Sequence, residues 1–502
     1  MVSTKRKIVR NTIANTLLKI SKYAINFFLF PFIIYYVGVE DYGIYLLVGA
    51  FVGYFGLLDF GVGGALVKYV AEFNAKEDDI KVNEMVNSTF AFYLGIGIII
   101  ALSIFIIGTF YVNVFNIDPT QIEKARLIAY ITALGALTSW PIRSFGNALQ
   151  GLQRYDYNAI VQFAVALINA VVTIILLLSG YGIIELILFG IIIGALGQLA
   201  IVVLVQRLLP YLEVRRKYMG ISTMKKIFKF SSVVFVSQIT SLIILGTDRI
   251  VIGAFVSVSA ITLYAIARKL HDLSHTASAL PSSAILPAAT ELDTLGKKKH
   301  LQKLLIRGGK YKCALILSVT VVLMILAEPL IRFWMGEDYI DMTWPAQVYL
   351  SYWLIFAAWG ITGTVLLSLE KYKPILIINI TAAIGNLILS LILVQWYGIL
   401  GVILGTVIPN LIILPIIIPY GLKLAGMKIR KVASGLWLKT YPIAGVSAIV
   451  LVFTQWFYEP RSLIDVGILA FFGLAIFWII FYKLGLNTGE RRQLKKYVRS
   501  IF

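Results

Sequence analysis

The sequence predicts an all-α polytopic membrane protein with about 14 transmembrane helices, each of about 20 residues. Hydrophobic residues make up 59% of the 502 positions and charged residues only 14%, and the mean hydropathy is +0.86. A soluble domain carries about 25% charged residues, so most of this surface must face lipid. Apolar runs of membrane-spanning length recur along the chain, and they do not alternate in polarity as the strands of a transmembrane β-barrel would.

The apolar runs predict these spans: 11–37, 42–69, 86–112, 122–150, 157–179, 182–207, 225–255, 259–290, 302–327, 344–369, 372–396, 399–424, 434–457 and 462–484. The first run is too long for the core of a signal peptide and contains two lysines, so it is expected to be a retained helix. A single cysteine, Cys313, excludes an internal disulfide and metal sites built on several cysteines.

The net charge of +20 is distributed as a membrane topology requires. Lysine and arginine gather in alternate gaps, at residues 5–10, 215–229, 297–310, 423–431 and 491–499, whereas the other gaps hold only Lys124, Arg126, Arg332 and Arg461. This pattern follows the positive-inside rule and places both termini in the cytoplasm. The basic excess therefore indicates topology and contact with anionic lipids, and no nucleic-acid partner is expected.

The gaps are short, so the function is expected to lie within the helical bundle. A weak internal repeat relates the two halves, because a shift of 219 positions places Lys7-Ile8-Val9-Arg10 on Lys226-Ile227-Phe228-Lys229 and Tyr45 on Tyr264. We therefore expect two pseudo-symmetric six-helix lobes, with two helices appended: residues 1–208, 209–425 and 426–502. Parallel repeats of this kind place a transport site near the midplane, between the halves.

Charged residues inside the predicted spans are candidates for function, because each costs at least about 2.5–3.5 kcal/mol near the bilayer centre. The cations are Lys19, Lys22, Arg143, Arg249, Arg268 and Lys269. The acids are Asp59, Asp248 and Asp272. This surplus of positive charge fits a water-filled cavity for an anionic headgroup, since guanidinium groups hold phosphates bidentately.

Asp59 is expected at a similar depth to Lys19 and Lys22, about 15–18 Å from the cytoplasmic end of its helix. One interpretation is an ion pair with one of these lysines that fixes helix packing. The alternative is that Asp59 titrates or binds a cation, and so couples transport to a gradient of H⁺ or Na⁺. The sequence does not identify that ion, and it predicts no cofactor.

In the span 259–290, Arg268, Asp272 and His275 lie on one helix face, and the simplest expectation is an Arg268–Asp272 pair. His271 and His275 are one turn apart, but no third ligand accompanies them, so no metal site is expected. Arg249 lies near the outer end of its helix, where its side chain could instead reach the interface.

Several motifs resemble the polysaccharide-biosynthesis membrane proteins, the O-antigen flippases of the multidrug/oligosaccharidyl-lipid/polysaccharide (MOP) exporter superfamily. The motifs are Val37-Gly-Val-Glu-Asp-Tyr-Gly-Ile-Tyr45, Leu57-Leu-Asp-Phe-Gly-Val62, Leu149-Gln-Gly-Leu-Gln-Arg-Tyr155 and Thr247-Asp-Arg-Ile-Val-Ile-Gly253. Their order and spacing cover most of the chain, while the last two spans carry little of the signature.

The resemblance implies a V-shaped bundle in the cytoplasmic membrane, similar to that of drug exporters of the MATE type. It implies a flippase that moves a polyprenyl-(pyro)phosphate-linked oligosaccharide to the outer leaflet, with polysaccharide polymerisation or export machinery as a further partner. Related peptidoglycan-precursor flippases line their cavity with arginines from helices 1, 2 and 8. Here those helices offer Lys19 and Lys22, then Asp59, then Arg268 and Lys269, which argues against peptidoglycan precursor as the cargo.

Three other functions compete with this interpretation. A MATE-type drug exporter would need a carboxylate-centred cation site without surplus cations. A membrane glycosyltransferase or polymerase could use Glu40-Asp41 as an acidic pair, although two acids at the start of a helix more simply favour its N-terminus. A scaffold without transport fits poorly with so many costly intramembrane charges. Sugar composition, the undecaprenyl or dolichyl carrier and the oligomeric state are not encoded in any visible motif.

Overall fold

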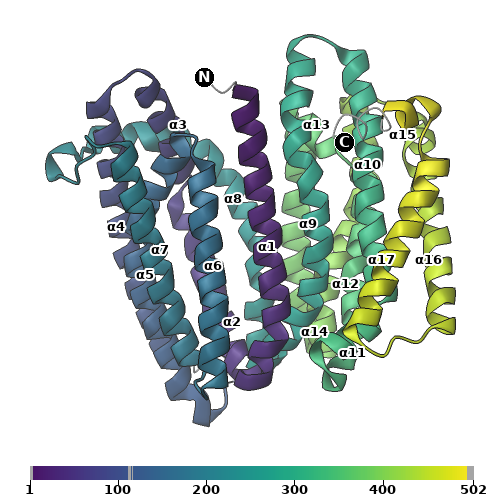
Figure 1. The fold of residues 1–502 in the computed structure, drawn as a ribbon, viewed down its shortest axis with the longest axis horizontal. Coiled ribbons are helices and arrows are strands. Elements are labelled where there is room, and N and C mark those ends of the chain that lie inside the picture. The colour runs from purple at the N-terminus through teal and green to yellow at the C-terminus, as the bar shows by residue number, and fades with distance from the viewer. Residues whose placement is uncertain (1–3, 111–114, 116, 494–502) are drawn as a thin grey trace. The chain divides into compact units, whose positions relative to one another are not determined.

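The computed structural model describes the backbone of residues 4–110, 115 and 117–493 (Figure 1). Side chains are described in the same ranges except at residues 4–17, 19–20, 229–230, 232–245, 280, 282–284 and 287. The described residues are almost entirely helical and contain no strand. They form two compact units, Met1–Thr262 and Leu263–Phe502.

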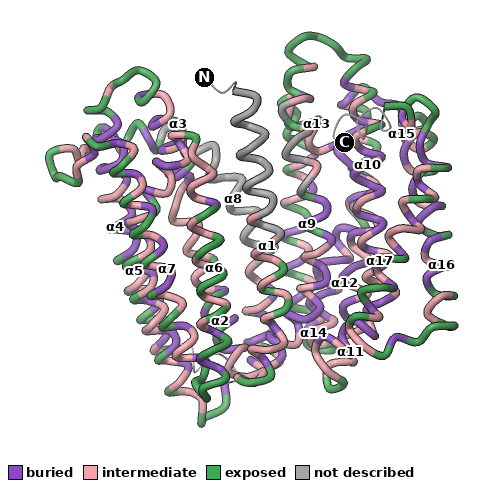
Figure 2. Tube along the Cα trace, in the orientation of Figure 1, coloured by how far each residue is buried: buried purple, intermediate pink, exposed green. Residues whose placement is uncertain are grey.

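Unit 1 contains the helices α1 (Thr4–Val37), α2 (Val39–Phe55), α3 (Val62–Ala75), α4 (Asp79–Phe110), α5 (Ile122–Gly151), α6 (Tyr155–Leu178), α7 (Ile183–Leu208) and α8 (Ile221–Phe255). Helix α5 lies at the centre of this unit and packs against α3, α4 and α7, while α6 lies against α1 and α7. Leucine, isoleucine and phenylalanine side chains stay exposed along α4, α6 and α7 (Figure 2). Exposed apolar faces of this extent are expected to contact lipid.

Unit 2 contains most of α9 (Val258–Thr294), then α10 (Lys298–Ile325), α11 (Ala327–Met335), α12 (Thr343–Trp359), α13 (Thr362–Ser368), α14 (Lys373–Leu424), α15 (Ile429–Gly435), α16 (Tyr441–Phe457) and α17 (Leu463–Ile480). Helices α10 and α12 form its centre, and α10 also packs against α16 and α17. The core of this unit joins residues of α10, α12 and α14 with Phe477 in α17 and Phe481 in the turn Phe481–Gly485 that follows it.

Helix α14 is a hairpin of two helices within its 52 residues. Gly398 takes a φ of 52° there, a conformation that side chains disfavour. The two arms run back along each other, because Asn386 donates to Thr406 Oγ1 at 2.8 Å and Ser390 donates to the Val402 carbonyl at 3.4 Å. The predicted boundary between the spans 372–396 and 399–424 therefore falls at the observed reversal.

Two predicted spans are broken rather than continuous. The span 42–69 is interrupted after the 3₁₀ turn Gly56–Asp59, where Phe60 and Gly61 have φ values of 49° and 76°. The span 344–369 is interrupted at Gly360, and its two helices meet at 50°. In the described residues, eight helices are long and apolar enough to cross a membrane, or nine if this bent pair is one span. The chain is thus a multi-pass membrane protein, while the number of about 14 spans and the three segments 1–208, 209–425 and 426–502 stay predictions.

Candidate functional site

Unit 1 contains a partly open cavity of about 470 Å³ among α1, α2, α5, α6 and α7. Such a volume lies within the range of small-molecule sites, about 300–1,000 Å³. Much of its wall is polar, although the helices around it are apolar on their outer faces. The polar side chains on the described part of the wall are Asn26, Tyr42, Tyr45, Thr132, Thr138, Ser139, Trp140, Arg143, Asn169, Thr173 and Gln198.

Arg143 is the one charged side chain on the described wall, and no aspartate or glutamate accompanies it there. Its guanidinium lies 3.9 Å from the centre of the Trp140 ring. The two residues share a face of α5 because they are three positions apart, and this stacking fixes the orientation of the guanidinium. Among the described residues Arg143 has no ion pair within 4.0 Å, and its side chain is exposed to the cavity.

Asp59 lies at the break between α2 and α3, where two consecutive residues with positive φ end the 3₁₀ turn. The hydroxyl of Tyr93, a fully buried residue of α4, donates a hydrogen bond to Asp59 Oδ1. Asn147 of α5 donates in turn to the Tyr93 hydroxyl at 3.5 Å. The carboxylate is therefore held by the phenol of α4, which is itself bonded from α5, and this chain of hydrogen bonds ties the break to the centre of the unit.

The Asp59 contact is connected to the cavity through aromatic packing. The rings of Tyr93 and Trp140 meet edge to face, with their centres 6.0 Å apart. Arg143 is close enough to Asp59 and Tyr93 for electrostatic interaction, although no ion pair forms. Two candidates from the sequence, Asp59 and Arg143, thus belong to one cluster. Sequence reasoning missed Tyr93, Trp140 and Asn147, because candidates were chosen by charge and these side chains are neutral.

The expected pair between Lys22 and Asp59 does not form. Lys22 donates to Gln162 Oε1 of α6 at 2.9 Å, and Asp59 is bonded to Tyr93 instead. The physical reason is helix arrangement: α1 packs mainly along α6, and equal depth in the bilayer does not make two helices neighbours. The side chain of Lys19 lies outside the described residues.

Arg249 lies close to the two tyrosines of the cavity wall, Tyr42 and Tyr45, which interact with it electrostatically. Its Nε atom is buried and has no hydrogen-bond partner among the described residues. The neighbouring Asp248 is 1% exposed. Arg249 therefore neighbours two residues of the wall and is not itself among the residues that line the cavity.

In unit 2 the expected pair of Arg268 and Asp272 is present. Arg268 Nε donates to Asp272 Oδ1 at 3.2 Å, and its Nη1 donates to the Tyr264 hydroxyl at 3.2 Å. The ring of His271, one residue before Asp272, stacks on Tyr349 at 4.0 Å. Arg268 is thus neutralised by its own helix, and Lys269 beside it is half-buried.

Among the described residues, no group of three or more histidine, cysteine, aspartate or glutamate side chains is placed so that it could hold a metal ion. His275 lies 5.6 Å from the Trp353 ring and is exposed, while His271 is buried. Glu40 and Asp41 occupy the first turn of α2, and Asp41 pairs with Lys124 at 2.9 Å. This arrangement agrees with a charge at a helix N-terminus.

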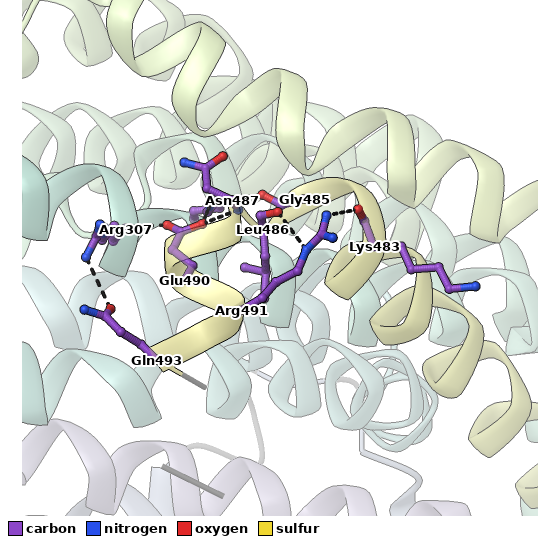
Figure 3. Close-up of polar contacts among 9 residues, drawn as sticks. Arg307, Lys483, Gly485, Leu486, Asn487, Glu490, Arg491 and Gln493 are labelled. Carbon is purple, nitrogen blue, oxygen red and sulfur yellow. Dashed lines mark hydrogen bonds and ion pairs between the residues drawn. The ribbon is translucent and has the colours of Figure 1, made fainter. Parts of the chain in front are cut away.

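Sequence reasoning also missed two buried lysines of α10. Lys312 is 6% exposed, and Lys310 is 2% exposed. Lys310 Nζ donates to Glu490 Oε2 at 2.6 Å and to the Gly485 carbonyl at 2.9 Å. Glu490 also accepts from the backbone N–H of Asn487 at 2.8 Å (Figure 3). This C-terminal cluster anchors the segment after α17 to α10.

Comparison with known proteins identifies the family of this chain. The family model described as polysaccharide biosynthesis protein matches residues 8–293. The uncharacterized membrane protein EpsK of Bacillus subtilis (strain 168) is 21% identical over 480 residues, which are 92% of this chain and 92% of that protein. A Yersinia pseudotuberculosis protein named for O-antigen export is 20% identical over 417 residues, 80% of this chain and 92% of that one.

Solved structures share the fold. The lipid II flippase MurJ in an inward closed conformation matches with a TM-score of 0.71 and 16% identity, over 95% of this chain and 99% of that one. An inward-facing multidrug resistance MATE family transporter of the MOP superfamily matches with a TM-score of 0.65 and 14% identity, over 82% and 94% of the two chains.

Proposed function

Because the chain belongs to the polysaccharide biosynthesis protein family, we propose that it is a flippase for a polyprenyl-(pyro)phosphate-linked oligosaccharide. It works in the cytoplasmic membrane with both termini in the cytoplasm, and it moves the glycan to the outer leaflet by alternating access. The product feeds polysaccharide polymerisation or export machinery at the cell surface.

One observation carries this proposal: the cavity of unit 1 is polar, and Arg143 is the charged group on its described wall. A cargo with a lipid tail and a hydrophilic head needs a polar path through the bilayer for the head alone, since burying unpaired polar groups in lipid costs several kcal/mol each. A transporter for cationic drugs would instead place a carboxylate on the wall. Asp59, the nearby acid, is bonded to Tyr93.

The other intramembrane cations of unit 1 strengthen the preference for an anionic cargo. Lys22 is bonded to a neutral amide, and Arg249 has no carboxylate within 4.0 Å among the described residues. Positive charges without a local counter-charge raise the affinity of the surrounding space for anions. In unit 2, by contrast, Arg268 is neutralised by Asp272 and contributes less to such a field.

The test measures transfer of a labelled lipid-linked glycan across the membrane of proteoliposomes. Transfer is detected as the accessibility of the labelled glycan to a lectin or glycosidase added outside. We expect Arg143→Gln to slow transfer about tenfold or more, since a hydrogen bond to a charged group contributes about 1.5–3 kcal/mol. Arg154→Gln is the matched control, because Arg154 pairs with Asp156 and lies outside the cavity wall. Normal transfer by Arg143→Gln at normal abundance would contradict the proposal.

A further inference from the structure

The wall of the unit 1 cavity offers one positive charge surrounded by neutral hydrogen-bonding groups. The guanidinium carbon of Arg143 lies 3.9 Å from the centre of the Trp140 ring, and among the described residues its N–H groups make no hydrogen bond or ion pair, so they are available to a ligand. A planar fork of this kind matches one carboxylate bidentately. A pyrophosphate carries at least two negative charges, and the described wall holds no second cation to match them.

The neutral groups on the wall suit hydroxyls, which both donate and accept hydrogen bonds. Gln198 Oε1 is buried and has no hydrogen-bond partner among the described residues, so it can accept a hydrogen bond from a ligand. Thr132 and Thr138 donate to carbonyls of their own helix at 2.7 and 3.0 Å, which leaves their oxygen lone pairs available as acceptors. Asn169 adds an amide with no hydrogen bond to the described residues.

An aromatic surface completes the wall. Tyr45 is 41% exposed and packs beside Tyr42, with ring centres 5.6 Å apart. One side of Trp140 is covered by Arg143, and Tyr93 meets that ring at an edge. The tyrosine pair is therefore the open aromatic face, and such a face packs against the C–H groups of a pyranose ring.

We infer that this cavity is a subsite for a carboxylate-bearing sugar of the lipid-linked glycan, with Arg143 bound to the carboxylate and Gln198 accepting from a ring hydroxyl. The inference rests on the proposed function and narrows its cargo to acidic glycans. A lipid tail is a poor occupant, because it would leave the wall's polar atoms unpaired. By contrast, an open surface depression of about 600 Å³ in unit 2 has a largely apolar lining that includes Met324, Trp344 and Val348.

The experiment compares two probes that differ in one group, methyl β-D-glucuronide and methyl β-D-glucoside, by saturation-transfer NMR on the purified full-length protein in detergent. We expect the glucuronide to bind about tenfold more tightly than the glucoside, and Arg143→Gln to remove that difference. Arg143→Lys should keep part of the preference, because it retains the charge and loses the fork. Gln198→Leu should weaken both probes alike, and Arg154→Gln should change neither.

Equal binding of the two probes by the wild-type protein, or an unchanged preference in Arg143→Gln, would overturn the inference. Gel filtration and circular dichroism establish that each variant is folded. Inorganic pyrophosphate is added as a competitor: if it displaces glucuronide at lower concentration than glucuronate itself, the cavity holds the carrier's phosphate and the sugar subsite is wrong, while the flippase proposal stands. If the protein binds glucuronide but transfers no lipid-linked glycan, the inference of a sugar subsite would stand and the proposed flippase function would be refuted.

Discussion

The Tyr93 hydroxyl donates a hydrogen bond to Asp59 Oδ1, and this bond fixes the point at which the chain leaves α2 and turns into α3. Tyr93 itself is completely buried and is reached by Asn147 from α5. A carboxylate, a phenol and an amide on three different segments therefore hold the helix break in place beside the cavity.

Removing the Tyr93 hydroxyl is expected to destabilise unit 1. Tyr93→Phe leaves the half-buried Asp59 carboxylate without its donor, at a cost of about 1–3 kcal/mol. Thermal unfolding of the purified protein measures this change. Tyr130→Phe is the control, since its hydroxyl bonds the neutral Thr109 at 3.1 Å and should matter less. Equal unfolding temperatures for the two variants would show that the Asp59 contact is not special.

Gly43 in α2 is expected to tolerate no side chain. A Cβ at this position would collide with the backbone carbonyl of Val258, which cannot rotate away. Gly43→Ala should therefore cost about 1–3 kcal/mol by overpacking and lower the abundance of folded protein in the membrane. Gly49→Ala on the same helix meets nothing within 4 Å and should behave as wild type. Similar abundance of both variants would contradict the close approach.

The segment 209–220 is held to α4 by two asparagines that pair with its backbone. Asn83 donates to the Tyr211 carbonyl at 3.0 Å and accepts from the Glu213 N–H at 2.9 Å. Asn87 donates to the Glu213 carbonyl at 2.8 Å and accepts from the Arg215 N–H at 2.9 Å. Each asparagine thus satisfies one donor and one acceptor of the segment.

Loss of these bonds should free the segment for cleavage. Asn87→Ala is expected to increase the rate of trypsin cleavage after residues 215–217 about fivefold or more, because two hydrogen bonds of about 1 kcal/mol each are removed. The measurement is limited proteolysis of the protein in detergent. Asn74→Ala, at an exposed position without a side-chain hydrogen bond, should leave the rate unchanged. An unchanged rate in Asn87→Ala would refute the role of the pairing.

The buried pair of Lys310 and Glu490 is expected to respond asymmetrically to mutation. Glu490→Gln leaves a buried ammonium without its anion and should cost about 3–5 kcal/mol, whereas the double change Lys310→Met with Glu490→Leu should recover most of that loss. Arg307→Gln is the control, because its side chain is 47% exposed and an exposed pair contributes about 0–1 kcal/mol. Thermal unfolding distinguishes them, and a double variant no more stable than Glu490→Gln would contradict the prediction.

The positions of the helices could be predicted because hydropathy reports burial in lipid directly. The predicted span 122–150 corresponds to α5, and 182–207 corresponds to α7, within a residue or two at each end. The break at Asp59 was missed because Leu57, Leu58 and Phe60 kept the run apolar across it. The remaining signal was two glycines, Gly56 at the start of the turn and Gly61 just before α3.

The hydrogen-bond and ion-pair partners of the charged residues could be predicted only where the two residues are close in the sequence. The Arg268–Asp272 pair follows from helical spacing alone, and it is present. Lys22 and Gln162 are 140 residues apart, and nothing in a hydropathy pattern says which helices are neighbours. The cavity could not be predicted from the sequence for the same reason, since its wall combines residues of five helices.

The C-terminal cluster also limits the order in which the protein itself can fold while it is being synthesised. Lys310 enters the membrane with α10, but its counter-ion Glu490 is synthesised 180 residues later. Until the ribosome has passed Glu490, the nascent α10 carries an ammonium group that has no anion to receive it. Helix α10 can therefore complete its buried ion pair only after the segment that follows α17 has been synthesised.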